Sequence, residues 1–250
     1  NLYKEVLKEN PEHVESISLL GTLLAQTKRY DLAKNLLQKV IQIQPDYAMS
    51  HNNLGNVLKE IGEHQKAISS FEKAIQIQPN YAEAHYNLAN IQRELGEHQK
   101  AISCYEKAIR IQPNYLMAYN NLGEVLLELG EHHKAISCYE KAIEIKSDNV
   151  DVYNNLGLVF KELGEHQKAI NCYEKAIKID PNNINAVNGL SDLFKIIQLG
   201  NITKTNSTSL KELFLFLFRK NSIIYKDIFH KAKLLLFVEE NDNQVRQIVN

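Results

Sequence analysis

Apolar and polar residues follow a helical spacing through most of the chain, in segments separated by short turns. Within residues 48–81, the stretch AMSHNNLGNVLKEIG carries apolar residues at helical spacing, and its last residue, Gly62, ends the helix in a left-handed conformation. A second stretch places apolar residues four and three apart on one stripe: Ala67, Phe71 and Ala74. Pro79 ends it, and Asn80 is placed to cap the next helix. The pattern therefore predicts two helices in this segment.

The helix-breaking residues recur with one period along the chain. All five prolines lie on a 34-residue grid, and Ser147 fills the one vacant grid point. The prolines are Pro11, Pro45, Pro79, Pro113 and Pro181. The glycines form two columns of the same period: Gly21, Gly55, Gly123 and Gly157, then Gly62, Gly96, Gly130 and Gly164. A period of this length is typical of stacked helix pairs. We therefore predict an all-α protein with five repeats, at 14–47, 48–81, 82–115, 116–149 and 150–183.

The residues at fixed places in each repeat resemble the tetratricopeptide-repeat family. Its small and large apolar positions are matched by Leu54, Gly55, Ala67 and Phe71, and by their equivalents in the other repeats. The resemblance implies a right-handed superhelical α-solenoid whose first helices line a concave surface. The chain departs from the family in having no tryptophan, in Gln92 at an apolar position, and in Lys28 where later repeats carry Gly.

The segments flanking the repeats predict further helices. Residues 1–13 align with the second helix of a truncated upstream repeat, and 184–199 with a capping helix that covers the last repeat. Residues 200–209 form a polar linker. Residues 210–250 form a helical tail that leads toward a further domain in one interpretation.

Composition and charge narrow the class of partner. The chain has 250 residues, 44% hydrophobic and 24% charged, with a formal net charge of −1. A charge so close to zero does not attract nucleic acid or an anionic membrane, so we expect neither as a partner. The longest apolar run, Leu213 to Phe218, is far shorter than the roughly 20 residues that cross a bilayer. Three cysteines without a C-x-x-C pair favour free thiols and a cytoplasmic location: Cys104, Cys138 and Cys172.

Catalytic and metal-binding motifs are missing from the sequence. It contains no H-E-x-x-H, G-x-S-x-G or phosphate-binding glycine loop, so we expect no catalytic residues, no cofactor and no metal. Histidines recur once per repeat at His64, His98, His132 and His166, too far apart to share one ion. Partial packing of the rings is the favoured interpretation. Glutamates at Glu60, Glu94, Glu128 and Glu162, with basic neighbours, indicate a solvated face with salt bridges.

Asparagines on the first helices are the main candidates for a binding site. An amide both donates and accepts, so it can pair with the peptide group of an extended ligand. From the resemblance, which places these positions on the concave surface, we predict a peptide-binding groove. Its residues are Asn52, Asn53, Asn56, Tyr86, Asn87, Asn90, Asn120, Asn121, Asn154 and Asn155. The alternative is that these amides join neighbouring helices. If so, replacing Asn87 or Asn121 by Ala would lower thermal stability, whereas pure groove residues would change binding alone.

Two functions from different classes follow from this pattern. The first is a protein–protein interaction scaffold that binds extended peptide or protein segments in the groove. The alternative is the substrate-recruiting arm of a glycosyl-, methyl- or sulfotransferase, covalently linked to a downstream catalytic domain. It rests on the YNNLG motif and the asparagine ladder, which resemble the repeat arm of O-linked N-acetylglucosamine transferases. The chain does not resemble the carboxylate-clamp repeats, because Asn and Tyr replace the Lys that they need. Self-association through residues 1–13 is a third, structural interpretation.

Overall fold

The computed structural model describes Val6 and residues 9–196 of the chain. Within these residues it contains eleven α-helices and no strand, which confirms the predicted all-α solenoid of helix pairs. The first helices of the repeats are α2 (Val14–Gln26), α4 (Ala48–Glu60), α6 (Ala82–Glu94), α8 (Leu116–Glu128) and α10 (Val150–Glu162). The second helices are α3 (Tyr30–Ile43), α5 (His64–Ile77), α7 (His98–Ile111), α9 (His132–Ile145) and α11 (His166–Ile179). A single helix, α12 (Ile184–Ile196), follows them.

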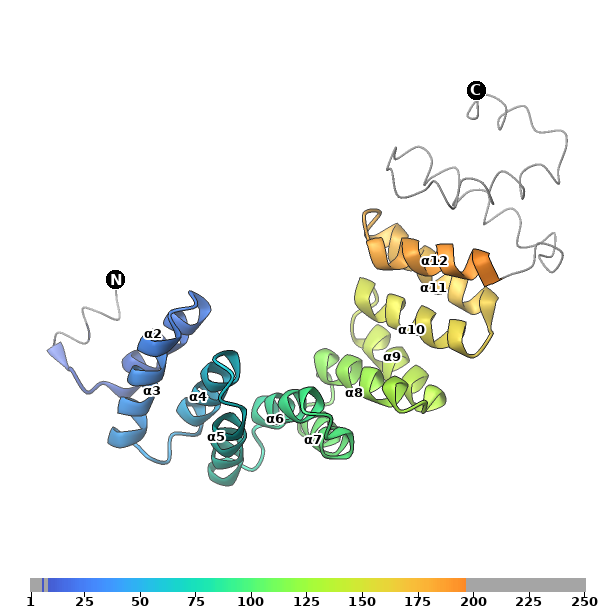
Figure 1. Cartoon of the computed structure of the whole chain (residues 1–250). Coiled ribbons are helices and arrows are strands. Elements are labelled where there is room, and N and C mark those ends of the chain that lie inside the picture. Colours follow the sequence, from blue (N-terminus) through green and yellow to red (C-terminus); the bar gives the residue numbers. More distant parts are fainter. Residues whose placement is uncertain (1–5, 7–8, 197–250) are drawn as a thin grey trace, which may run out of the picture. The chain divides into compact units, whose positions relative to one another are not determined.

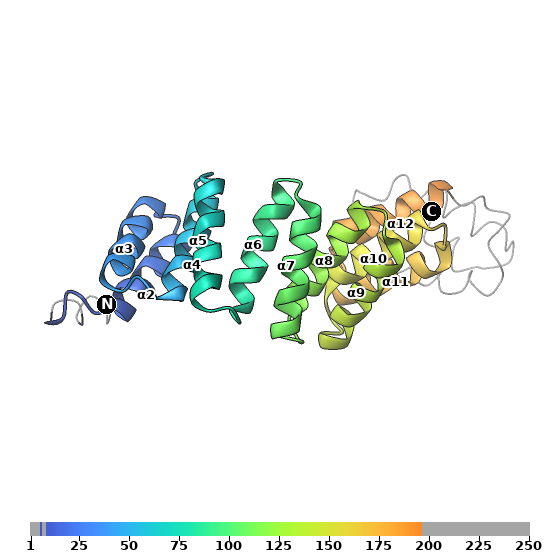
Figure 2. The ribbon, with the colours of Figure 1, turned by 90° about the horizontal axis from the view of Figure 1, so that it is seen from below.

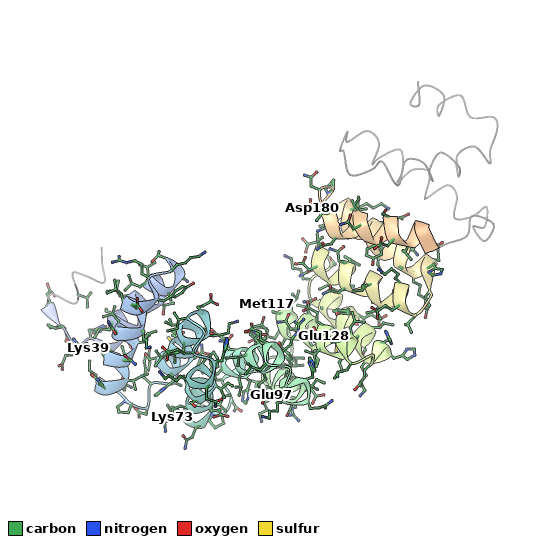
Figure 3. The ribbon with its side chains drawn as sticks, in the orientation of Figure 1. Lys39, Lys73, Glu97, Met117, Glu128 and Asp180 are labelled. Atoms are coloured by element: carbon green, nitrogen blue, oxygen red, sulfur yellow. The ribbon has the colours of Figure 1, made fainter. Side chains whose placement is uncertain are left out.

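The chain forms two compact units that meet in sequence between Ile145 and Lys146. The larger unit holds α2 to α9, and the smaller holds α10 to α12. In the larger unit, α2, α4 and α6 form one layer and α3, α5 and α7 form a second layer beside it (Figures 1 and 2). The helices α3, α5 and α7 each contact their own first helix and also the first helix of the next repeat. The first helices of the larger unit therefore share one face, and Lys73 of α5 projects away from it (Figure 3).

Within a repeat, a small residue on the first helix meets a large side chain on the second. A Cβ added to Gly55 would lie 2.6 Å from a ring carbon of Phe71, and one added to Gly123 would lie 2.6 Å from the Tyr139 ring. Ala67 and Ala135 on the second helices are fully buried. Contacts this short leave no room for another methyl group, so the residue sizes fix how closely the two helices approach.

The turns between the two helices of a repeat depend on a left-handed residue. Gly62, Gly96, Gly130 and Gly164 all have positive φ, between 72° and 80°, as the pattern predicts for Gly62. The Glu63 amide then donates to the Leu58 carbonyl oxygen at 2.8 Å and closes the end of α4. In the first repeat, Lys28 takes this place with φ 59°. A residue with a Cβ is strained there.

Helix starts differ from the sequence prediction at Asn80. The residue preceding α6 is Tyr81, and it makes no side-chain capping hydrogen bond. The prediction that Asn80 caps this helix is therefore wrong. The turn between Pro79 and α6 is closed by a backbone bond instead, because the Tyr81 amide donates to the Gln78 carbonyl oxygen at 3.1 Å.

In the smaller unit, α12 packs against α10 and α11. It buries Ala186, Val187, Leu190 and Leu193, and Gly189 lies so close to Tyr173 that an added Cβ would be 2.4 Å from the ring. The predicted capping segment ran to residue 199, of which 197–199 lie outside the described residues. The linker at 200–209, the tail at 210–250 and most of segment 1–13 also lie outside them.

Replacing Lys28 by Gly should stabilise the chain. Glycine adopts positive φ without steric cost, so we expect K28G to raise the free energy of unfolding by about 1 kcal/mol. The exposed Lys73, inside α5, provides the control. There, Lys73→Gly should lower the free energy of unfolding by about 1 kcal/mol. Denaturant titration measures both, and an unchanged or lowered stability of K28G would contradict the strain at Lys28.

Candidate functional site

Eight of the ten predicted residues lie on α4, α6 and α8 of the larger unit. The face that these helices share with α2 is here called the first-helix face. Asn52 of α4 is fully buried at the centre of a small network. Its Nδ2 donates to Glu83 Oε1 at 3.2 Å and to the Tyr81 hydroxyl at 3.5 Å. Its Oδ1 accepts from Asn87 Nδ2 on α6 at 3.0 Å. These bonds join the first helices of two consecutive repeats.

The same arrangement recurs between α6 and α8. Asn121 Nδ2 donates to the Tyr86 hydroxyl and to Asn90 Oδ1, each at 3.0 Å. Asn90 Oδ1 also accepts from the hydroxyl of the buried Tyr105 at 2.6 Å. Asn120 donates to Asn121 Oδ1 at 3.3 Å and to Glu124 at 2.8 Å. The structure thus brings four of the predicted residues, Tyr86, Asn90, Asn120 and Asn121, into one hydrogen-bonded cluster.

The remaining predicted residues occupy different surroundings. Asn53 Nδ2 donates to the Thr22 hydroxyl on α2 at 2.9 Å. Asn56 is half-buried and forms no side-chain hydrogen bond with any described residue. In the smaller unit, Asn154 is buried and donates to Asn183 Oδ1 at 2.9 Å, and Asn155 is half-buried. The amides at the sixth repeat position in α4, α6 and α8 therefore join neighbouring first helices, the alternative that the sequence left open.

The hydrogen bonds between helices do not use every donor and acceptor of these side-chain amides. Among the described residues, nothing donates to Asn53 Oδ1 or Asn87 Oδ1, and Asn90 Nδ2 donates to nothing. An amide offers two donors and an acceptor oxygen with two lone pairs. The first-helix face therefore keeps acceptors on α4 and α6 and a donor on α6.

Ion pairs connect the C-terminal ends of the same helices. Lys59 Nζ lies 3.0 Å from Glu94 Oε1, and Arg93 Nη2 lies 2.7 Å from Glu128 Oε1 while Nη1 contacts Glu124. Burial alone would lower the pKa of Arg93, but the two carboxylates outweigh it and raise that pKa. The predicted salt-bridged face is confirmed at Glu94 and Glu128.

An open hollow of ≈ 510 Å³ lies among these groups. Its walls are Lys59, Asn90, Arg93, Glu94, Asn121 and Glu128. Cations, anions and amides line it together, and its volume falls in the range of ligand-sized clefts. Figure 3 labels Met117 and Glu128 near the two ends of α8, which forms one side of this face.

A row of tyrosines on this face is missing from the sequence prediction. Tyr47, Tyr81 and Tyr115 close three consecutive repeats, and all are half-buried. Burial and the Glu83 carboxylate raise the pKa of Tyr81 to about 12, and the same causes raise the pKa of Tyr115. The 34-residue spacing of the three tyrosines was a signal that could have found them.

The chain belongs to the tetratricopeptide-repeat family. The family model, described as tetratricopeptide repeat, matches residues 14–80, 46–114, 80–148 and 114–182 in overlapping segments. No curated protein matches the chain.

Solved structures of repeat proteins share this fold. A crystal structure of MamA is 31% identical, with 64% of this chain and 94% of that chain covered and a TM-score of 0.60. YrrB, described as a TPR protein with an unusual peptide-binding site, is 21% identical, with coverages of 76% and 98% and a TM-score of 0.62. PilF of Pseudomonas aeruginosa is 20% identical, with coverages of 87% and 97% and a TM-score of 0.68.

The histidines of this tetratricopeptide chain serve packing and turns. His51 and His85 are buried, and each Nε2 lies within 3.0 Å of a proline carbonyl oxygen, of Pro45 and Pro79 respectively. A carbonyl only accepts, so each Nε2 carries the proton. His98, one of the four histidines that recur once per repeat, lies 3.6 Å from Glu128. Across Val6 and residues 9–196, no three His, Cys, Asp or Glu side chains are grouped closely enough to hold a metal ion.

The three cysteines are free thiols in weakly reactive surroundings. Burial raises the pKa of Cys104, Cys138 and Cys172 to about 11. Over the described residues, the search for a helix both long and apolar enough to span a bilayer found none.

Replacing Asn87 by Ala should destabilise the repeats. It leaves the buried Asn52 Oδ1 without a donor, so we expect a loss of about 1–3 kcal/mol in the free energy of unfolding. Asn56→Ala is the matched control, since Asn56 bonds to no described residue, and it should change stability little. Thermal denaturation compares the two variants. Equal melting temperatures for N87A and wild type would show that the amide bond does not hold the helices together.

The thiols should react slowly with iodoacetamide in the folded protein. Only the thiolate is nucleophilic, and because burial raises the thiol pKa from the usual 9.0 to about 11, the thiolate fraction at pH 8 is about 100-fold smaller. Mass spectrometry at timed intervals measures alkylation of Cys104 and Cys138, with the guanidinium-unfolded chain as control. Equal rates in both states would rule out the protective environment.

Proposed function

We propose that the chain is a protein-interaction scaffold that binds extended polypeptide segments on the first-helix face of the larger unit. The observation that carries the proposal is the set of unused amide groups on α4 and α6, at Asn53, Asn56, Asn87 and Asn90, beside the hollow. A peptide backbone presents donors and acceptors in alternation, and such amides match either.

The spacing of the helices suits an extended ligand. Packed helices lie about 8–10 Å apart, and an extended chain advances about 3.3 Å per residue. One repeat therefore corresponds to about three ligand residues, so amides on consecutive helices meet peptide groups at regular intervals. YrrB, of the same fold, is described as having a peptide-binding site. That description supports a peptide as the class of ligand.

Hydrogen bonds alone give only weak binding. Each is worth about 1 kcal/mol net, and four of them approach the roughly 4 kcal/mol of a millimolar complex. Tighter binding needs side-chain contacts as well. The ion pairs of the hollow and the tyrosines beside Glu83 are the groups on this face that supply them.

The alternative function, the substrate-recruiting arm of a transferase, rests on the YNNLG motif and on the asparagines that recur along the first helices. The sequence of the full-length protein would decide it, through a nucleotide-sugar or adenosylmethionine site downstream. A cytoplasmic location likewise remains a prediction from the cysteines.

The test uses a random 12-residue peptide library displayed on phage, panned against the whole chain. We expect the selected peptides to protect backbone N–H groups of α4 and α6 from hydrogen exchange. For a selected peptide, Asn56→Ala should weaken binding about fivefold, the value of one hydrogen bond, without changing thermal stability. Asn35→Ala on α3, an exposed asparagine outside this face, is the matched control. A library that yields no binder, or protection confined to second helices, would overturn the proposal.

A further inference from the structure

Glu83, at the start of α6, carries an exposed carboxylate at the edge of the first-helix face. Asn52 Nδ2 donates to its Oε1 at 3.2 Å and also reaches the Tyr81 hydroxyl. The carboxylate is near enough to raise the pKa of Tyr81 and of Tyr115, after burial as the larger cause. Groups from α4, from α6 and from the two turns that precede α6 and α8 therefore gather around one negative charge.

The tyrosine rings near Glu83 are held in fixed positions. The Tyr86 and Tyr115 ring centroids lie 5.0 Å apart with a tilt of 36° between the rings. Tyr86 also contacts the buried Tyr105, with centroids 5.9 Å apart, and its hydroxyl accepts from Asn121. These contacts restrain the rings before any ligand arrives, which lowers the entropy lost on binding.

Glu83 differs from Glu94 and Glu128 of this face in having no cationic partner. Glu94 pairs with Lys59, and Glu128 pairs with Arg93. Among the residues that the structure describes, no Lys, Arg or His forms an ion pair with Glu83. An exposed carboxylate beside aromatic rings attracts a guanidinium or ammonium group, through its charge and through the negative faces of the rings.

Exposed methionines flank Glu83 one repeat away on either side. Met49 of α4 and Met117 of α8 occupy the same repeat position as Glu83, with 42% and 51% of their surfaces exposed. Methionine side chains adapt to varied apolar groups. One repeat corresponds to about three residues of extended ligand. The row Met49, Glu83, Met117 therefore matches a ligand in which a basic residue stands three positions from an apolar residue on each side.

We propose that Glu83, Tyr81, Tyr86 and Tyr115 form a subsite for an arginine or lysine side chain of the bound segment, with Met49 and Met117 contacting apolar side chains on either side. This inference rests on the proposed function, since it names the chemistry of the segment that the first-helix face binds.

The effect of Glu83 on helix stability can be measured separately from its proposed role in binding. A carboxylate near a helix N-terminus also stabilises the helix, because its charge interacts favourably with the helix dipole. Glu83→Gln removes the charge but keeps an oxygen that accepts from Asn52. The fold of E83Q should therefore be retained, and its melting temperature shows any effect of the charge on the helix alone.

The experiment compares peptides selected from the same 12-residue library by wild type, by E83Q and by Glu140→Gln. Glu140 is an exposed glutamate on α9, a second helix, so E140Q makes the same change of charge away from the face. We expect wild type and E140Q to select peptides enriched in Arg or Lys three residues from an apolar residue, and E83Q to lose the enrichment.

Fluorescence anisotropy with one selected peptide then tests the contact itself. Replacing its basic residue by citrulline or norleucine, which lack the charge, should weaken binding to wild type about tenfold and leave binding to E83Q unchanged. The wild-type arm needs no variant, so it decides the matter even if E83Q folds poorly. If the selected peptides are not enriched in Arg or Lys, the subsite proposal is wrong and the scaffold function still stands. The same holds if removing the basic charge weakens binding to E83Q as much as binding to wild type. A library without binders would overturn both.

Discussion

The close contact between a small residue and a large ring inside each repeat is the constraint on which the rest of the structure depends. Gly55 and Gly123 leave room for Phe71 and Tyr139 and for nothing more, because an added Cβ would lie 2.6 Å from the ring in each case. Side chains packed this tightly allow one separation and one rotation of the two helices. Within the larger unit, α3, α5 and α7 each hold the next first helix at a fixed offset. Residues 31 or 35 positions apart on consecutive first helices then come within hydrogen-bond reach.

The amide ladder shows how that offset is used. Asn87 reaches Asn52, and Asn121 reaches Tyr86 and Asn90, across the gap between consecutive first helices. Asn53 and Asn87 each donate to the neighbouring first helix and keep the side-chain oxygen for a ligand, and Asn90 keeps its donor. The bonds between helices keep the surface polar without leaving its buried amide, Asn52, unpaired. A surface of this kind suits the backbone of the proposed peptide ligand, since it offers repeated weak hydrogen bonds.

Charges on the first-helix face are divided between the repeats and the proposed ligand. Lys59 forms an ion pair with Glu94, and Arg93 forms ion pairs with Glu124 and Glu128. These pairs link the C-terminal ends of α4, α6 and α8. At the other end of α6, Glu83 has tyrosine rings around it and no described cation beside it. The contrast between paired and unpaired carboxylates on one surface is what gives the inferred subsite its preference for a positive side chain.

The sequence by itself determined the all-α fold and its recurring helix pairs, because prolines, left-handed glycines and small–large pairs act over a few residues and recur every 34. It also singled out the asparagines of the first helices and gave two alternative roles for them, binding a peptide or joining neighbouring helices. It failed at Asn80, where a backbone bond closes the turn without a side-chain cap, and it did not reveal Tyr81 and Tyr115 beside Glu83. Only the tertiary structure decided which amides face one another and which carboxylate lacks a cation, since those pairings join residues 31 to 35 positions apart whose distance depends on how consecutive repeats pack.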